Sequence, residues 1–284
     1  MDPVTNAITL VFLVTTMVAI GLKVTVGELA AALDHRGLMI RSLVVNVVVA
    51  PLAGLLLVTV VPMSQDAAVA ILLLAAAPGG LNAIQFTSKS RGALGYAAVL
   101  LFVLSLVAVL LSPFIAALLL HLRASLALPY GRIVGALLLT LLLPLTAGLA
   151  VHRWAPRAAD LLSRPLSVCG TLAFVVVVVR LMAKRKEAMA ALGSGELLAM
   201  VGLILGLMIV AWLLGGPSKE TRRVLATATS MRNAGLCLIV SAHAFPDTGV
   251  LVAVVAFSGL MIFPNMLLMV YAMAKQRRST GARV

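Results

Sequence analysis

Long apolar runs separated by short polar loops constrain this chain more than any other feature of its sequence. Of the 284 residues, 62% are hydrophobic and 11% are charged, whereas soluble domains are roughly 45–50% apolar and about 25% charged. A helix needs about 20 apolar residues to cross a hydrocarbon core about 30 Å thick, because lipid cannot hydrogen-bond the backbone. We therefore expect an all-α polytopic membrane protein that forms a single membrane domain.

The apolar runs and the loop residues between them predict nine transmembrane helices. Their approximate ranges are 5–23, 38–62, 67–88, 94–121, 130–151, 160–182, 195–215, 221–245 and 247–273. The first run follows Met1-Asp2-Pro3 without a basic segment, and no small-residue cleavage site comes after it. We interpret it as a retained span and not as a signal peptide.

The formal net charge of +13 is carried mostly by loops between the apolar runs. With the N-terminus outside, most lysines and arginines fall in inside loops, as the positive-inside rule requires, although the cluster from Arg180 to Lys186 opposes this bias. The charge therefore indicates topology and not a nucleic-acid partner. We expect a multi-pass protein of the inner (plasma) membrane with a cytoplasmic C-terminus.

A weak internal similarity suggests the inverted repeat that is common in secondary transporters. Span 1 leaves through Gly21-Leu22-Lys23 toward Glu28-Leu29-Ala30, and span 6 leaves through Arg180-Leu181-Met182 toward Glu187-Ala188-Met189. Each is followed by one ordinary span and then by an interrupted one. We predict a first repeat over 1–122 with crossover helix 67–88, and a second over 123–284 with crossover helix 221–245. The arrangement is four spans plus five.

The first interrupted span contains Ala77-Pro78-Gly79-Gly80. Proline removes a backbone donor and glycine permits unusual dihedrals, so a helix is expected to break here near mid-membrane. The N-terminus of the following half-helix, at about Leu81 and Asn82, would offer free N–H groups to an anion. The alternative is a packing kink, because Pro and Gly are common in membrane helices.

The second interrupted span runs from Thr227 to Gly235 and contains Arg232 within an otherwise apolar stretch. A charge at this depth costs at least about 2.5–3.5 kcal/mol, so it should face a cavity or a partner. All nine acidic residues fall in loops or at span ends, which leaves no obvious counter-ion. The guanidinium of Arg232 is expected to bind an anionic substrate through a bidentate pair of hydrogen bonds. Alternatively, backbone carbonyls satisfy it as a structural clamp.

Further polar groups within the spans complete the candidate site. The predicted substrate-binding residues are Gly79, Gly80, Leu81, Asn82, Gln85, Arg232, Asn233 and His243. Each polar side chain among them has an alternative role in joining helices by hydrogen bonds. His243 lies near a span end, where a structural role is the alternative to titration near neutral pH. The predicted spans contain no nucleophile with a base and no metal-ligand set, so an enzyme is not expected.

The motifs of this sequence resemble those of a known family, the bile acid:sodium symporters. Ala77-Pro78-Gly79-Gly80 resembles the first crossover motif, and Ala228 to Leu236 resembles the second. Ile20-Gly21-Leu22 followed by Glu28-Leu29 is similar to the opening helix and loop, so the resemblance covers essentially the whole chain. It implies a panel domain, a core domain, and two unwound helices that cross at mid-membrane and bind the substrate there.

The same resemblance indicates degenerate sodium sites, as in a bacterial member of the family. Positions where sodium-coupled members have oxygen ligands are Ala83, Ile84, Ala97, Leu101, Ala228 and Arg232 in this sequence. Asn46 matches an amide ligand and Asn233 matches a substrate-contacting Asn. The remaining ion-binding candidates are Asn46, Thr229 and Met231, a poor oxygen cage for a metal cation. We hypothesise that the charge of Arg232 stands in for the missing cation.

These observations together predict a secondary transporter of a small organic anion that works by alternating access with weak or absent sodium coupling. The alternatives are a sodium-coupled symporter of the same family, a ten-helix drug or metabolite exporter, and, from another class, an anion channel. No cofactor is expected. The expected partners are the substrate and the bilayer, with the chain a monomer or a loose oligomer.

Overall fold

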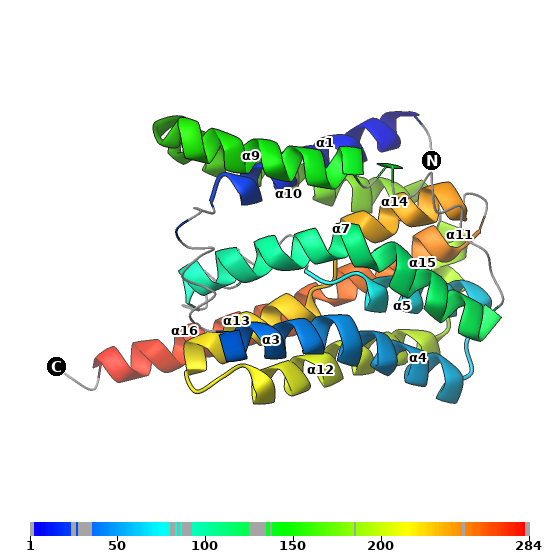
Figure 1. The fold of residues 1–284 in the computed structure, drawn as a ribbon. Helices are drawn as coiled ribbons and strands as arrows, with labels where there is room; N and C mark the ends of the chain where they lie inside the picture. The colour runs from blue at the N-terminus through cyan, green and yellow to red at the C-terminus, as the bar shows by residue number, and fades with distance from the viewer. Residues whose placement is uncertain are drawn as a thin grey trace.

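A computed structural model describes residues 3–23, 36–79, 93–124, 138–184, 186–245 and 248–281, together with the isolated positions 27, 83, 86, 135 and 136. These described residues are almost entirely helical and contain no strand, which confirms the all-α prediction. The N-terminus and the C-terminus lie at opposite ends of the helix bundle (Figure 1).

The helices begin and end close to the predicted span boundaries. The first half contains α1 (Pro3–Gly21), α3 (Arg36–Val44), the π-helical turn η1 (Val45–Val49), α4 (Ala50–Val60), α5 (Gln65–Ala76) and α7 (Leu94–Ala124). The second half contains η2 (Leu138–Leu142), α9 (Leu143–Trp154), α10 (Pro156–Lys184), α11 (Lys186–Ala190), α12 (Ser194–Leu214), α13 (Lys219–Ser230), α14 (Ala234–Ala244), α15 (Val250–Leu260) and α16 (Ile262–Gly281).

Six helical segments in the described part of the chain are long and apolar enough to cross a membrane, and a bent pair in α7 raises the number to seven. The two halves of that pair, 95–108 and 110–123, meet at 56°. The segments over predicted spans 3 and 5 are shorter apolar helices, Gln65–Ala76 and Leu138–Trp154. Span 3 is short because its helix stops before Pro78. The count of nine spans and the inverted repeat therefore remain predictions.

Two groups of helices are visible in Figure 1. One layer consists of α1 with α9 and α10, and α1 packs mainly against these two helices. The remaining helices form a larger group around α5, which packs against α4, α7 and α15. The layer thus combines a helix from the first predicted repeat with two from the second.

The centre of the larger group holds the two interrupted segments. Every residue of α5 from Ala67 to Ala76 is buried. Every residue from Val224 in α13 to Ser241 in α14 is also buried. In contrast, α4, α10 and α12 expose rows of Leu, Val and Ile side chains, as lipid-facing helices do. The fold therefore places both breaks away from the lipid.

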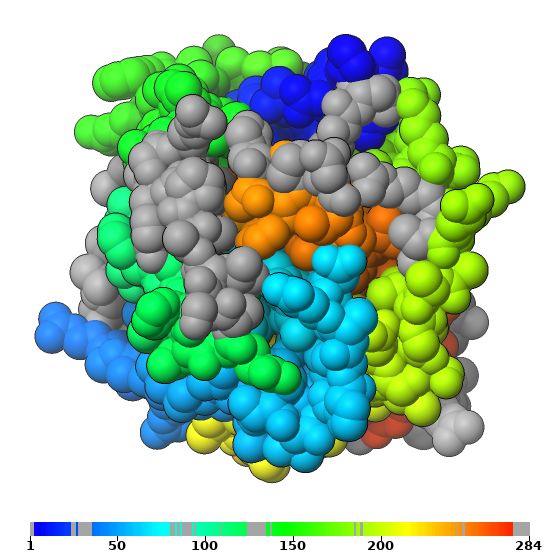
Figure 2. Space-filling view, turned by 90° about the vertical axis from the view of Figure 1, so that its right-hand side faces the viewer, coloured from blue at the N-terminus to red at the C-terminus, as the bar shows by residue number. Residues whose placement is uncertain are grey.

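On the face shown in Figure 2, the cyan segment around α5 lies beside the orange segment around α15 and the yellow-green segment around α12. Acidic residues bind the N-termini of these helices. Glu196 accepts hydrogen bonds from the backbone N–H groups of Ser64 (2.6 Å) and Gly193 (3.1 Å), beside the starts of α5 and α12. Asp66 accepts one from Gly249 at the start of α15 (2.9 Å). A carboxylate is favourable at the positive end of a helix. These two acids are therefore bound to backbone N–H groups at helix starts.

Candidate functional site

The two helix breaks touch each other directly. Helix α5 ends at Ala76, and Gly79 then adopts a φ of +76°. A Cβ at Gly79 would lie 2.8 Å from the Cβ of Leu104, so both the dihedral and the space require glycine. The backbone N–H of Asn233, between α13 and α14, donates to the Ala77 carbonyl at 3.0 Å. The prediction that both segments are interrupted is correct for the described residues.

Two prolines remove the usual helical donors of backbone carbonyls at this junction. The Leu74 carbonyl would normally accept from the N–H of residue 78, but Pro78 has none, and this carbonyl accepts instead from the Ala77 N–H at 3.1 Å. In η1 the Ala50 N–H donates to Val45, five residues back. In the same register the Asn46 carbonyl would accept from residue 51, which is also a proline. A carbonyl oxygen has two lone pairs, so each of these carbonyls can accept a bond from a side chain.

The guanidinium of Arg232 binds both of these carbonyls and the neighbouring carbonyl of Ala75. Its Nε donates to the Leu74 carbonyl at 2.9 Å, and Nη2 donates to the Ala75 carbonyl at 2.6 Å. Nη1 donates to the side-chain Oδ1 of Asn46 at 2.9 Å, and Nη2 approaches the Asn46 carbonyl at 3.4 Å. The side chain is only 2% exposed. Four of the five N–H groups of the guanidinium are used in these bonds.

Asn46 connects this cluster to a third segment. Its Nδ2 donates to the Ser42 carbonyl and to the Thr229 hydroxyl, both at 3.0 Å. The backbone N–H of Arg232 donates to the sulfur of Met261 at 3.1 Å, at the junction of α15 and α16. The cluster therefore ties together α3–η1, α5, α13 and α15, with the arginine at its centre.

The positive charge of Arg232 is held by dipoles. Within the described part of the chain, every hydrogen-bond acceptor of its guanidinium is a neutral carbonyl or amide oxygen. The carbonyls of Leu74 and Ala75 lie at the C-terminal, negative end of α5, which stabilises a cation. Dipoles orient and stabilise the charge but do not cancel it. A net positive charge therefore stays at the junction of residues 77–79 with residues 231–233, which we call the crossing.

Asn233 presents an unused donor beside that charge. Its side chain is 0% exposed, and its Oδ1 accepts from the Leu236 N–H at 3.1 Å, which caps α14. The Nδ2 group is buried and has no hydrogen-bond partner in the part of the chain that the structure describes. A buried donor left unpaired costs about 1–3 kcal/mol. An amide donor at the positive end of α14 is thus available to an acceptor that the described residues do not supply.

The remaining predicted site residues have mixed outcomes. Gly79 lies buried at the first break, while Gly80, Leu81, Asn82 and Gln85 lie outside the described residues. His243 belongs to α14, but its side chain is also outside the description. Thr229 is bound to Asn46, and the Met231 N–H donates to the Thr227 carbonyl at 3.0 Å. The structure brings Asn46, Thr229 and Arg232 together in one hydrogen-bonded cluster.

Sequence reasoning missed the partners that Arg232 has in this conformation. It named backbone carbonyls in general as the alternative to an anion, but not those of Leu74 and Ala75. The available signal was the pair of prolines, because Pro78 and Pro51 each mark a carbonyl that loses its donor. Met261 gave no such signal, since a methionine in an apolar run looks like any core residue.

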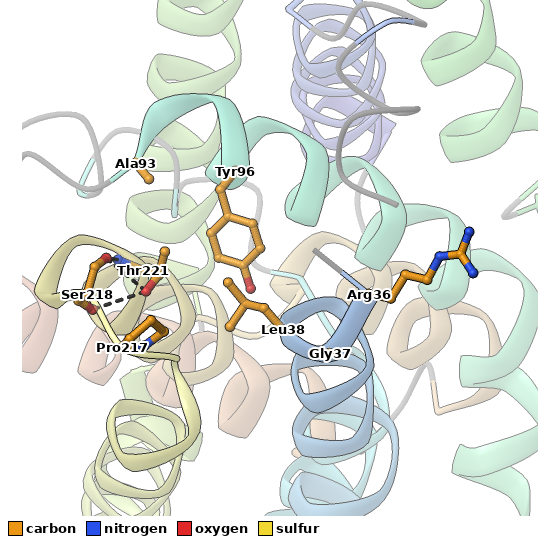
Figure 3. A pocket seen from close by; sticks show the side chains of 8 residues that line it. All are labelled: Arg36, Gly37, Leu38, Ala93, Tyr96, Pro217, Ser218 and Thr221. Atoms are coloured by element: carbon orange, nitrogen blue, oxygen red, sulfur yellow. Dashed lines mark hydrogen bonds between the residues drawn. The ribbon is translucent and has the colours of Figure 1, made fainter. Parts of the chain in front are cut away.

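A separate cavity of about 540 Å³ lies between the starts of α3, α7 and α13. Figure 3 shows the Tyr96 ring pointing toward Leu38, with Pro217 and Ser218 on the facing turn and the Arg36 side chain directed away. The Tyr96 hydroxyl is hydrogen-bonded to Ser42 at 2.6 Å. This cavity does not contain Arg232 or Asn233, so it is distinct from the crossing.

The model of the Sodium Bile acid symporter family matches residues 10–192, which is more than half of the chain. The match includes the first break and ends before the second. None of the curated proteins matches. The apolar helices and the match agree with the multi-pass membrane protein predicted from the sequence, and the chain belongs to the sodium bile acid symporter family.

Proposed function

We propose that this chain carries a small organic anion across the membrane by alternating access, with the charge of Arg232 in place of a coupling cation. Members of the family are transporters and not enzymes. The observation that carries the proposal is a buried guanidinium at the junction of two broken helices, bound by oxygen dipoles and by no carboxylate among the described residues. Such a site retains one positive charge without any bound metal.

The group that would contact the anion is the Nδ2 of Asn233, beside the N-terminus of α14. It is a buried donor with no hydrogen-bond partner among the described residues. Arg232 would act mainly through space, because four of its N–H groups already bind the protein. A unit charge about 6 Å from an anion contributes about 3 kcal/mol at an effective dielectric of about 20, roughly a hundredfold in affinity.

The two helix groups suggest which parts would move. We assign the layer of α1, α9 and α10 to the panel that the family resemblance implied, and the group around α5 to the core. At Gly235, which follows the second break, the layer contributes Phe12 and Leu13 against the core. Alternating access would change this contact while the crossing stays intact.

The distribution of basic loops supports an orientation in the inner membrane. We place the N-terminus outside and the C-terminus on the cytoplasmic side.

The test is uptake of organic anions into proteoliposomes that contain the purified protein. A panel of carboxylates and sulfonates is first screened for stabilisation of the protein, since a ligand stabilises the state that it binds. Uptake of each stabilising anion is then measured with sodium in the medium and with choline in its place. We expect equal rates. A strict requirement for sodium would refute the proposed coupling.

Two variants at Arg232 test the role of the charge. Arg232→Gln retains hydrogen bonding but is neutral, and we expect it to weaken anion affinity roughly a hundredfold. Arg232→Lys retains the charge and should keep most of the affinity if the protein folds. An unchanged affinity in folded Arg232→Gln would assign Arg232 to structure alone.

Sodium-coupled symport is the second candidate, and the name of the matching family favours it. It predicts that sodium stabilises the protein against heat and accelerates anion uptake. Flux per protein separates either carrier from an anion channel, because a channel passes ions without a conformational cycle for each one.

A further inference from the structure

We propose that the oxygen atoms around Arg232 form a preorganised cation site whose occupant is the chain's own guanidinium. Truncation of that side chain would then create a binding site for a free guanidinium ion. This inference shares with the proposed function the role of the Arg232 charge in anion transport, and rests on it in no other respect. The binding site itself follows from the geometry of the acceptors.

The cage consists entirely of acceptors, supplied by two segments far apart in the sequence. Helix α5 gives the carbonyls of Leu74 and Ala75, at 2.9 and 2.6 Å from the guanidinium nitrogens. Asn46 gives its side-chain Oδ1 at 2.9 Å and its carbonyl at 3.4 Å. The acceptors surround a planar fork of N–H groups, which is the donor pattern of a guanidinium ion.

The acceptors are held in place by features other than Arg232. Pro78 and Pro51 remove the usual helical donors of the Leu74 and Asn46 carbonyls, and the Leu74 carbonyl is held by the Ala77 N–H at 3.1 Å. The Asn46 side chain is fixed by its bonds to Ser42 and Thr229. The bond from the Asn233 N–H to the Ala77 carbonyl joins the two breaks independently of the arginine. Removal of the guanidinium therefore leaves an ordered, buried hole lined by oxygen.

The chemistry of this hole selects its ligand. A free guanidinium ion carries the same planar set of N–H donors and a charge that suits the C-terminal end of α5. Tetramethylammonium carries the same charge but has no N–H donor, so it cannot satisfy the acceptors. Sodium has the charge without the donors, and three carbonyl groups with one amide oxygen give it an incomplete oxygen shell.

The experiment measures thermal unfolding of three purified proteins in detergent: the natural chain, Arg232→Ala, and the double variant Arg232→Ala with Asn46→Ala. Each is titrated with millimolar guanidinium chloride, well below denaturing concentrations, and with sodium chloride and tetramethylammonium chloride as controls. We expect guanidinium to raise the melting temperature of Arg232→Ala by about 2–4 °C or more at saturation. We expect no rise for the natural chain, whose site is filled, or for the double variant, whose cage lacks an acceptor.

An equal shift in the natural chain, the absence of any shift in Arg232→Ala, or a shift with sodium alone would overturn the proposal. If Arg232→Ala is lost during purification, Arg232→Ser is prepared with and without guanidinium, and the yield of monodisperse protein is the readout. Yield restored by guanidinium supports the site, and yield restored equally by tetramethylammonium contradicts it. These measurements need no transport, so a sodium requirement in the uptake assay would refute the proposed function and leave this result standing.

Discussion

The layer of α1, α9 and α10 and the crossing of the two breaks are held together in opposite ways. In the layer, helices meet backbone to backbone at glycines. A Cβ on Gly21 would overlap the Leu145 carbonyl, and one on Gly148 would overlap the Val18 carbonyl. At the crossing, segments meet mainly through one charged side chain that binds backbone carbonyls, beside the backbone bond from Asn233 to Ala77. Shape complementarity secures the first region, and hydrogen bonds centred on one guanidinium secure the second.

A π-helical turn followed by a proline occurs in both regions, but the carbonyl that the proline affects has a different environment in each. Each of η1 and η2 is followed by one residue and then a proline, Pro51 in the crossing region and Pro144 in the layer. In η1 the carbonyl set free by the proline belongs to Asn46 and is bound by Arg232. The matching residue of η2 is Leu139, which is 66% exposed. The π-helical turn is therefore present in both regions, but only η1 contributes a carbonyl to the binding of the Arg232 guanidinium.

The largest expected effect is that of Arg232→Met, which keeps the length of the side chain and removes its charge and donors. Hydrogen bonds within a membrane protein contribute about 0.6–1.7 kcal/mol each, so the loss of four should lower the free energy of unfolding by roughly 2–7 kcal/mol. Anion transport should be lost. Unfolding is followed by heat in detergent, and uptake is measured in proteoliposomes.

The control for this variant is Arg232→Lys, which restores a positive charge and three donors. We expect Lys to recover part of the stability. Full stability in Arg232→Met would show that the crossing is secured by packing, as the layer is, and the contrast between the two regions would disappear.

Gly148→Ala is expected to have the next largest effect, and it acts on the layer. The added methyl would meet the Val18 carbonyl and would lie 3.0 Å from the Gly21 Cα, and backbone cannot rotate away as a side chain can. Overpacking of this kind costs about 1–3 kcal/mol. Thermal unfolding measures it. The matched control is Gly206→Ala in α12, where nothing lies within 4 Å and the stability should not fall.

Asn46→Ala should have an intermediate effect on the crossing. The substitution removes the Oδ1 acceptor of Arg232 and both donors to Ser42 and Thr229, while the backbone carbonyl at position 46 remains. We expect the free energy of unfolding to fall by about 1–2 kcal/mol. Anion affinity should change far less than in Arg232→Gln, because the charge is retained. An equal loss of affinity in both variants would point to Asn46 as a direct ligand.

The sequence was sufficient to predict the all-α fold and the positions of both breaks, and it singled out Arg232, because each leaves a local signal. Apolar runs mark spans, Pro and Gly interrupt them, and a charge in an apolar run is conspicuous. The partners of Arg232 could not be predicted in the same way. Leu74 and Ala75 contribute only their backbone carbonyls, and their side chains do not distinguish them from any other apolar residue. Which carbonyl meets the guanidinium depends on how distant segments pack.

The smallest expected effect belongs to Pro51→Ala, and it separates the role of the turn from that of the cation site. Alanine restores an N–H that can pair with the Asn46 carbonyl in the register of η1. That carbonyl is the longest contact of Arg232, at 3.4 Å, so the guanidinium should lose its weakest bond while the helix gains one. We expect these to offset each other to within about 1 kcal/mol in the free energy of unfolding.

Pro144→Ala is the matched variant in the layer, where the same restored N–H displaces no guanidinium. In Pro51→Ala, the restored N–H competes with the Arg232 guanidinium for the Asn46 carbonyl, so we expect anion affinity to fall slightly. Pro144→Ala should leave anion affinity unchanged. Thermal unfolding and anion binding are measured for both variants. Identical behaviour would mean that both prolines only shape their helices, and the cation site would then depend on Pro78 and the end of α5 alone.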